Sequence, residues 1–164
     1  AGMGSLSYGE TAGERMRLGV MLNDPEEEHS CFADNTHNDH CYNGVVSQSV
    51  DLGSYTRSDG TVVSGASLSD LVSETDAALD MEMKGKLSDA VLALGRIKTA
   101  AEAGFTYDMM LERGNDAGEA LIMGGVNGLI DQTRSIERVI AALGADGIEI
   151  EGSDSLDDPD AVFQ

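Results

Sequence analysis

Tryptophan is absent from this 164-residue chain, and aromatic residues make up only 4% of it. Because bases and sugars are often held by stacking on aromatic rings, this composition argues against such a binding platform. Basic residues are also scarce: 10 Lys and Arg stand against 30 Asp and Glu, which gives a formal net charge of -20. A field of this sign repels phosphate backbones and anionic lipids, so we exclude nucleic-acid binding and expect cations or basic partners.

Long hydrophobic runs are missing as well. No apolar run approaches the roughly 18 to 20 residues that a spanning helix needs, so we expect a chain that does not span a membrane. The first seven residues lack the basic segment and apolar core of a signal peptide, and position 1 is not Met. We therefore expect a processed product or a piece of a longer protein.

Hydrophobic periodicity predicts an all-α protein. Helices are expected over Tyr8–Leu22, from Thr36 to about Leu52, from the Asp76 cap to Ala103, and from about Asp116 to Leu143. On the second of these helices the core side should carry Cys41, Val45, Gln48 and Leu52. The long stripes should share one core that contains Leu79, Met83, Leu87, Leu94, Leu129, Ile136 and Val139.

Two segments depart from the helical pattern. Asp59-Gly60, between Tyr55-Thr56 and Thr61–Val63, predicts a short β-hairpin insertion. Residues 145–164 contain seven acidic residues and no Lys or Arg, which predicts an extended acidic tail that apolar residues pin to the body. Residues 1–164 are thus expected to form a single domain, an up-and-down bundle of four main helices.

The residues best suited to chemistry gather between positions 26 and 41. This stretch holds every histidine and cysteine of the chain, together with several carboxylates. Such donors suit iron or another divalent cation, and the predicted metal ligands are Glu28, His29, Asp34 and His37. The spacing matches no standard zinc motif. The alternative is that the histidines cap a helix end and the glutamates are solvated.

The two cysteines, Cys31 and Cys41, allow one disulfide and require none. In an oxidising compartment they could pair across the loop before the second helix, whereas a buried free thiol is the ordinary alternative. Nucleophile motifs are absent: there is no Gly-x-Ser-x-Gly elbow, no phosphate-binding Walker loop and no His-Glu-x-x-His helix. Arg15 beside Glu14 suits either a substrate clamp or a helix-surface ion pair.

Two strings resemble a known family: Gly-Glu-Arg-Met at 13–16, and Glu-Glu-His-Ser-Cys-Phe-Ala-Asp-Asn-Thr-His at 27–37. With Leu-Gly-Ser-Tyr at 52–55, Ser-Gly-Ala-Ser-Leu-Ser-Asp-Leu at 64–71 and Glu-Gly-Ser-Asp-Ser-Leu-Asp at 151–157, they are similar to the imelysin family, and most to its iron-regulated, IrpA-like branch. The resemblance runs from about Leu6 to Phe163 and concerns only the C-terminal half of such proteins.

The resemblance implies a periplasmic or outer-membrane-associated bacterial protein linked to iron uptake, built from two helical bundles. The family is classed among metallopeptidases, but its Gly-x-His-x-x-Glu motif is absent here, so the resemblance leaves enzymatic activity uncertain. A site between the two bundles would receive residues from the matching strings. Besides the predicted metal ligands, these ligand or inter-domain residues are Glu14, Arg15, Ser30, Asn35, Thr36 and Asp39.

The expected function is therefore that of an extracytoplasmic, iron-uptake-associated protein that binds a metal or ligand together with an N-terminal bundle. Two alternatives stay open: half of a metallopeptidase, and an autonomous binding or assembly module. The expected partner is the N-terminal bundle, from the same precursor or a separate chain, and a homo-oligomer is a further alternative.

Overall fold

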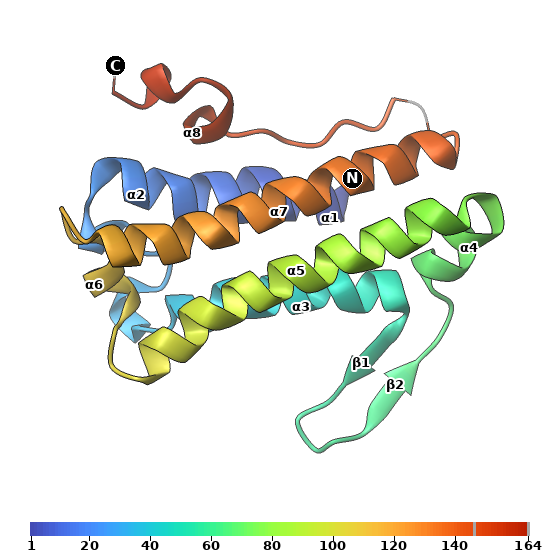
Figure 1. Cartoon of the computed structure of the whole chain (residues 1–164), viewed down its shortest axis with the longest axis horizontal. Coiled ribbons are helices and arrows are strands. Elements are labelled where there is room, and N and C mark those ends of the chain that lie inside the picture. The colour runs from blue at the N-terminus through green and yellow to red at the C-terminus, as the bar shows by residue number, and fades with distance from the viewer. Residues whose placement is uncertain (146, 164) are drawn as a thin grey trace.

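The computed structural model describes residues 1–145 and 147–163. It confirms an all-α bundle with a short hairpin (Figure 1). The principal helices are an N-terminal helical segment, α3 (Thr36–Leu52), α5 (Ala77–Glu102) and α7 (Asp116–Ala142). Figure 1 shows the N-terminal segment beside α7 and α3 beside α5. None of the described helices is long and apolar enough to cross a bilayer.

The N-terminal segment is one continuous run of helix in three parts: α1 (Gly2–Ser5), a π-helix over Leu6–Arg17, and α2 (Leu18–Leu22). The predicted end at Leu22 is confirmed, since Asn23 turns left-handed with φ 51°. The helical segment begins at Gly2, six residues before the predicted start at Tyr8. In the π-helix the backbone bonds span five residues instead of four, as in Leu18 N–H to Gly13 O.

Helix α3 has the predicted bounds and ends at Gly53, whose φ of 60° suits glycine. The predicted core side is wrong, since only one of its four residues, Cys41, is buried. The side that packs into the bundle is instead polar or small, with Thr36, His40, Cys41, Gly44, Ser47 and Asp51 buried. Val46 and Val50 are about half exposed, so α3 turns an apolar side to solvent.

The hairpin pairs β1 (Ser54–Thr56) with β2 (Val62–Ser64), and Tyr55 lies opposite Val63. Its turn contains the predicted Asp59-Gly60: Gly60 has a φ of 83°, and the Asp59 carboxylate accepts the Thr61 N–H at 2.8 Å. The hairpin projects from the end of α3 (Figure 1).

Caps define the starts of the later helices. Ser67 caps α4 (Leu68–Thr75), Asp76 accepts the Ala78 and Leu79 N–H groups at 3.0 Å at the start of α5, and Asn115 caps α7. A short helix, α6 (Tyr107–Leu111), lies between α5 and α7.

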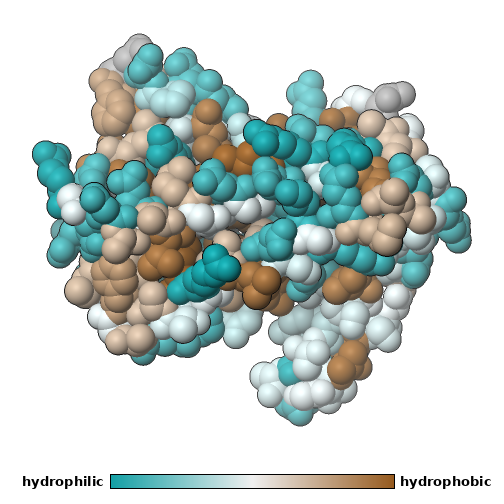
Figure 2. All heavy atoms as spheres, viewed as in Figure 1, coloured by the Kyte–Doolittle hydropathy of each residue, from teal (hydrophilic) through white to brown (hydrophobic). Residues whose placement is uncertain are grey.

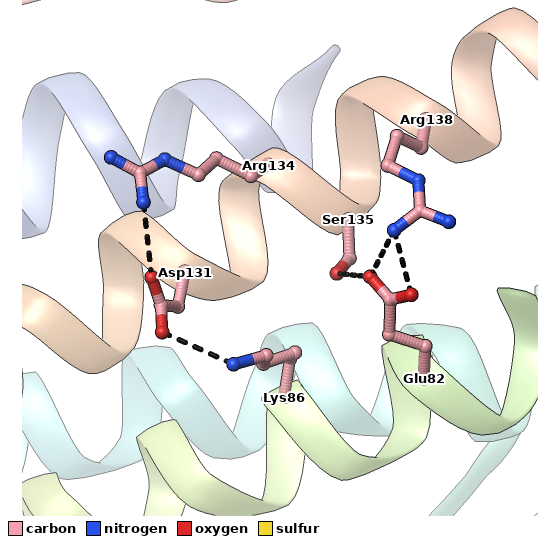
Figure 3. Close-up of polar contacts among 6 residues, drawn as sticks. All are labelled: Glu82, Lys86, Asp131, Arg134, Ser135 and Arg138. Atoms are coloured by element: carbon pink, nitrogen blue, oxygen red, sulfur yellow. Dashed lines mark hydrogen bonds and ion pairs between the residues drawn. The ribbon is translucent and has the colours of Figure 1, made fainter.

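Polar pairs join α5 to α7 along their antiparallel contact (Figure 3). The Glu82 carboxylate accepts from Arg138 Nη1 at 2.6 Å and from Ser135 Oγ at 3.0 Å. One turn further along α5, Lys86 donates to Asp131 at 3.1 Å. Such exposed pairs contribute little stability because water screens their charges.

The apolar core has two clusters instead of the single one predicted. Every residue of the predicted stripe is buried, but Leu94 and Leu129 belong to one cluster with Met16, Ile97 and Ile122. The other members of the predicted stripe form a second cluster with Val72; they are Leu79, Met83, Leu87, Ile136 and Val139.

The acidic tail crosses back over the N-terminal segment as α8 (Asp154–Asp157) and a 3-10 turn over Pro159–Phe163. The Tyr8 hydroxyl donates to the Asp157 carboxylate at 2.7 Å, and Ser153 donates to Glu14 at 2.5 Å. Gly9 makes this approach feasible, because a Cβ there would lie 2.7 Å from Glu151 O and 2.8 Å from Gly152 O.

A buried polar cluster beneath the loop before α3

The loop between α2 and α3 closes one end of the bundle against α6. It folds as two 3-10 turns, Pro25–Glu27 and Cys31–Ala33, and the Asp24 carboxylate caps the first by accepting the Glu26 N–H at 2.9 Å. This loop carries the histidine-rich string, so its path decides which of those side chains meet.

His40 lies at the centre of the arrangement and is fully buried. Its ring contacts Tyr107 of α6 edge-on, with centroids 5.2 Å apart, and stacks with His29 at 6.3 Å. Burial, together with the smaller effects of the nearby His29 and Arg15, lowers the pKa of His40 to about 3. His40 is therefore a neutral imidazole at physiological pH.

Four side chains here hold buried polar atoms that lack a hydrogen-bond partner among the described residues. The atoms are Glu28 Oε2, His37 Nδ1, both ring nitrogens of His40, and the Tyr107 hydroxyl. We call Glu28, His37, His40 and Tyr107 the His40 cluster. Leaving a buried polar atom unpaired costs about 1–3 kcal/mol, so several together point to a bound water or polar ligand as their natural partner.

Burial also raises the pKa of two groups in the cluster, the Glu28 carboxyl and the Tyr107 phenol. Desolvation raises the pKa of Glu28, as do the negative charges of Asp108 and Asp34, while the Thr36 hydroxyl opposes this shift. Desolvation and the charge of Glu28 raise the pKa of the Tyr107 phenol. The cluster thus offers the two nitrogens of the neutral His40 imidazole and a phenol hydroxyl close to the Glu28 carboxyl group. A cation or a hydrogen-bond donor would stabilise that carboxyl group in its ionised form.

The predicted ligand residues of the loop itself are used to hold its shape. The Asp39 carboxylate accepts from the Ser30 hydroxyl and, at 3.4 Å, from the Asn35 amide. The buried Thr36 hydroxyl accepts the Ser30 N–H at 2.9 Å. These bonds fix the shape of the loop at the start of α3. No side chain forms a capping hydrogen bond at this described helix start, and Glu28 is buried and not solvated.

Glu14 and Arg15 point to different surroundings. Glu14 binds the tail through Ser153, whereas Arg15 forms an ion pair with Glu10 at 3.0 Å and lies close enough to affect the pKa of His40. Glu10 and Arg15 are five residues apart, the same step as the backbone hydrogen bonds of the π-helix, so the winding of this segment brings the two side chains close.

The four predicted metal ligands differ in how deeply the loop buries them. His29 and Asp34 are exposed, His37 is partly buried and Glu28 is buried. Within residues 1–145 and 147–163, no three His, Cys, Asp or Glu side chains are placed to share a metal ion. The proposed ligand set therefore stays a prediction.

The cysteines are not paired: Cys31 is an exposed free thiol and Cys41 a buried one. Desolvation and the carboxylates of Glu28 and Glu26 raise the pKa of Cys31, and burial raises that of Cys41. Both thiols are therefore protonated near neutral pH and weak nucleophiles. The predicted disulfide is not formed in this structure.

The cluster contains two residues outside the predicted set, His40 and Tyr107. A usable signal for His40 exists in the sequence: Thr36, His40, Ser47 and Asp51 recur at helical spacing and mark a polar side of α3. No motif distinguishes Tyr107, which reaches the cluster from 67 positions further along the chain.

Fold and site together define a helical-bundle protein with a buried polar cluster at the loop end of the bundle. The family model described as Imelysin (peptidase M75) matches residues 1–136, most of the chain. The chain belongs to the imelysin family. None of the curated proteins matches it.

Proposed function

We propose that this chain is an extracytoplasmic, iron-uptake-associated imelysin-like module that binds a metal ion or small polar ligand at the His40 cluster. The observation that carries the proposal is the buried His40 ring, whose two nitrogens have no hydrogen-bond partner among the described residues. A neutral imidazole is the form that binds metals and accepts hydrogen bonds. The net charge of -20 raises the local concentration of cations around such a site.

The proposal includes a second imelysin-like bundle, the N-terminal one, as the partner that completes the site. Two features of this chain support it. Among the described residues the cluster provides a carboxyl group and imidazoles, but no three His, Cys, Asp or Glu side chains are placed to share a metal ion. The cluster also lies directly under an end loop.

Titration calorimetry with Zn²⁺ and with Fe²⁺ tests the proposal, first on this chain and then on the chain mixed with a separately produced N-terminal bundle. We expect weak binding by the chain alone and tighter binding by the mixture. The double variant His37→Gln/His40→Phe should abolish the saturable heat while circular dichroism keeps the same helix content. The matched control Asp59→Asn, in the exposed hairpin turn, should bind as the parent does. Equal stoichiometric binding by the double variant would show that the cluster is purely structural.

A further inference from the structure

The outward side of α3 is apolar, which reverses the usual arrangement of a surface helix. Tyr42, Val46 and Val50 recur at four-residue steps and are 55%, 49% and 52% exposed. The hairpin extends this surface, since Tyr55 and Val63 are 48% and 43% exposed and form a cross-strand pair. We call α3 with the hairpin and the adjoining side of α5 the α3 outer face; Figure 2 shows an apolar patch on the projecting hairpin.

Three hollows are lined by residues of this face, and the first two share Ser49, Ser54 and Tyr55. One, of about 420 Å³, lies between the hairpin and α3 and is lined by Val46, Val50, Tyr55 and Val63. A second, of about 580 Å³, adjoins it where α3 meets β1 and contains Arg57. The third, of about 670 Å³, lies between α3 and α5 and contains Arg96. Helix α3 has 17 residues and therefore spans about 25 Å, the length of a helical ligand of similar size.

The charges around these hollows are opposite to those of the whole chain. Although the sequence has 30 acidic residues and 10 basic ones, none of the residues that line the three hollows is acidic, and two are arginines. Neither Arg57 nor Arg96 forms an ion pair with a carboxylate in the described part of the chain. Two exposed guanidinium groups thus adjoin an uncharged apolar surface.

We propose that the α3 outer face docks an amphipathic helix of a partner protein, with an apolar stripe seated in the hollows and flanking carboxylates paired to Arg57 and Arg96. Apolar anchors in a groove with charged groups at the rim are the usual means of binding such a helix. A second copy of this chain fits less well. A two-fold interface would place the face against itself, where its arginines find no acid and two chains of charge -20 repel.

This inference is independent of the proposed function, because α3 presents the His40 cluster inward and this face outward. The probe is a synthetic helical peptide of about 18 residues, with a leucine stripe, flanking glutamates and one tryptophan. Since the chain has no tryptophan, the emission of the peptide reports binding directly. A twin with lysine in place of each glutamate serves as the charge-reversed probe, and both are titrated at about 0.15 M salt, where distant charges are screened.

We expect saturable one-to-one binding of the glutamate peptide and weaker binding of its lysine twin. The double variant Arg57→Glu/Arg96→Glu should weaken the glutamate peptide by about tenfold or more. Arg113→Glu, an exposed site in the loop before α7, is the matched control and should change little.

Tighter binding of the lysine twin, or unchanged binding to the double variant, would overturn the proposal. Analytical sedimentation of the parent chain provides a second test, because it measures the oligomeric state. A dimer of the parent chain that Val50→Asp dissociates would show that the occupant of this face is another copy and not an acidic helix.

Discussion

Replacing His40 by Phe should remove a definite part of the pH dependence of folding. The ring is buried, and its pKa in the folded state is about 3, against about 6.5 for an ordinary histidine. As pH falls below about 6.5, the unfolded chain binds a proton at this position that the folded chain does not. Stability from this group is therefore present above pH 6.5 and is lost as pH falls, by about 1.4 kcal/mol per pH unit.

Between pH 6.5 and pH 5 that slope amounts to about 2 kcal/mol. Asp51 works in the opposite direction: burial and the nearby Asp80 raise its pKa to about 6. The folded state thus keeps a proton on Asp51 that the unfolded chain has lost, and stability from that group falls as pH rises from about 4 to about 6. Because the two effects partly cancel in the parent protein, His40→Phe has to be compared with the parent at each pH.

Urea unfolding followed by circular dichroism provides the free energy of unfolding across this range. The difference between His40→Phe and the parent should change by about 2 kcal/mol from pH 6.5 to pH 5, in favour of the variant at the acid end. Asp51→Asn is the matched control, and its difference from the parent should move the other way as pH rises from 4 to 6. A His40→Phe difference that stays constant with pH would refute the argument, since it would mean that His40 titrates normally in the folded state.

Three further predictions concern packing and thiol access. Leu87→Ala should destabilise the fold by about 2–5 kcal/mol in the same assay because Leu87 is fully buried, and a loss of a few tenths would show that it is not. Gly124→Ala, exposed and with open space around it, should stabilise by roughly 1 kcal/mol and raise Tm by about 2–4 °C, whereas Gly9→Ala should destabilise because its methyl group meets the tail. Equal stabilisation by Gly124→Ala and Gly9→Ala would disprove the close contact between Gly9 and the tail. A thiol reagent should modify Cys31 in the folded protein and reach Cys41 only after unfolding, as mass measurement would show.

The parts of the fold that the sequence predicts are those with strong local signals. Gly53 ends α3 in the left-handed region, as expected of glycine after a helical pattern, and the Asp59-Gly60 turn forms the hairpin at the expected place. The stripe from Leu79 to Ile97 is buried because one helix is long enough to show several turns of an unbroken pattern.

The parts that the sequence does not predict depend on contacts between distant segments. The buried side of α3 is predicted wrongly because periodicity assumes that apolar residues face inward. In α3 the polar residues His40, Ser47 and Asp51 face inward instead. The single predicted core divides in two because periodicity along a helix does not say which neighbours each turn meets. The His40 cluster needs Tyr107, and no local pattern connects two residues so far apart in sequence.

The contact between the tail and the N-terminal segment also sets an order of events during synthesis. Glu14 and Tyr8 bind partners that lie 139 and 149 residues later in the chain. At roughly 5 to 20 residues per second, a ribosome needs about 7 to 30 s to make that intervening length. The side of the π-helix that carries Gly9 therefore stays uncovered by the tail until residues 151–157 have been made.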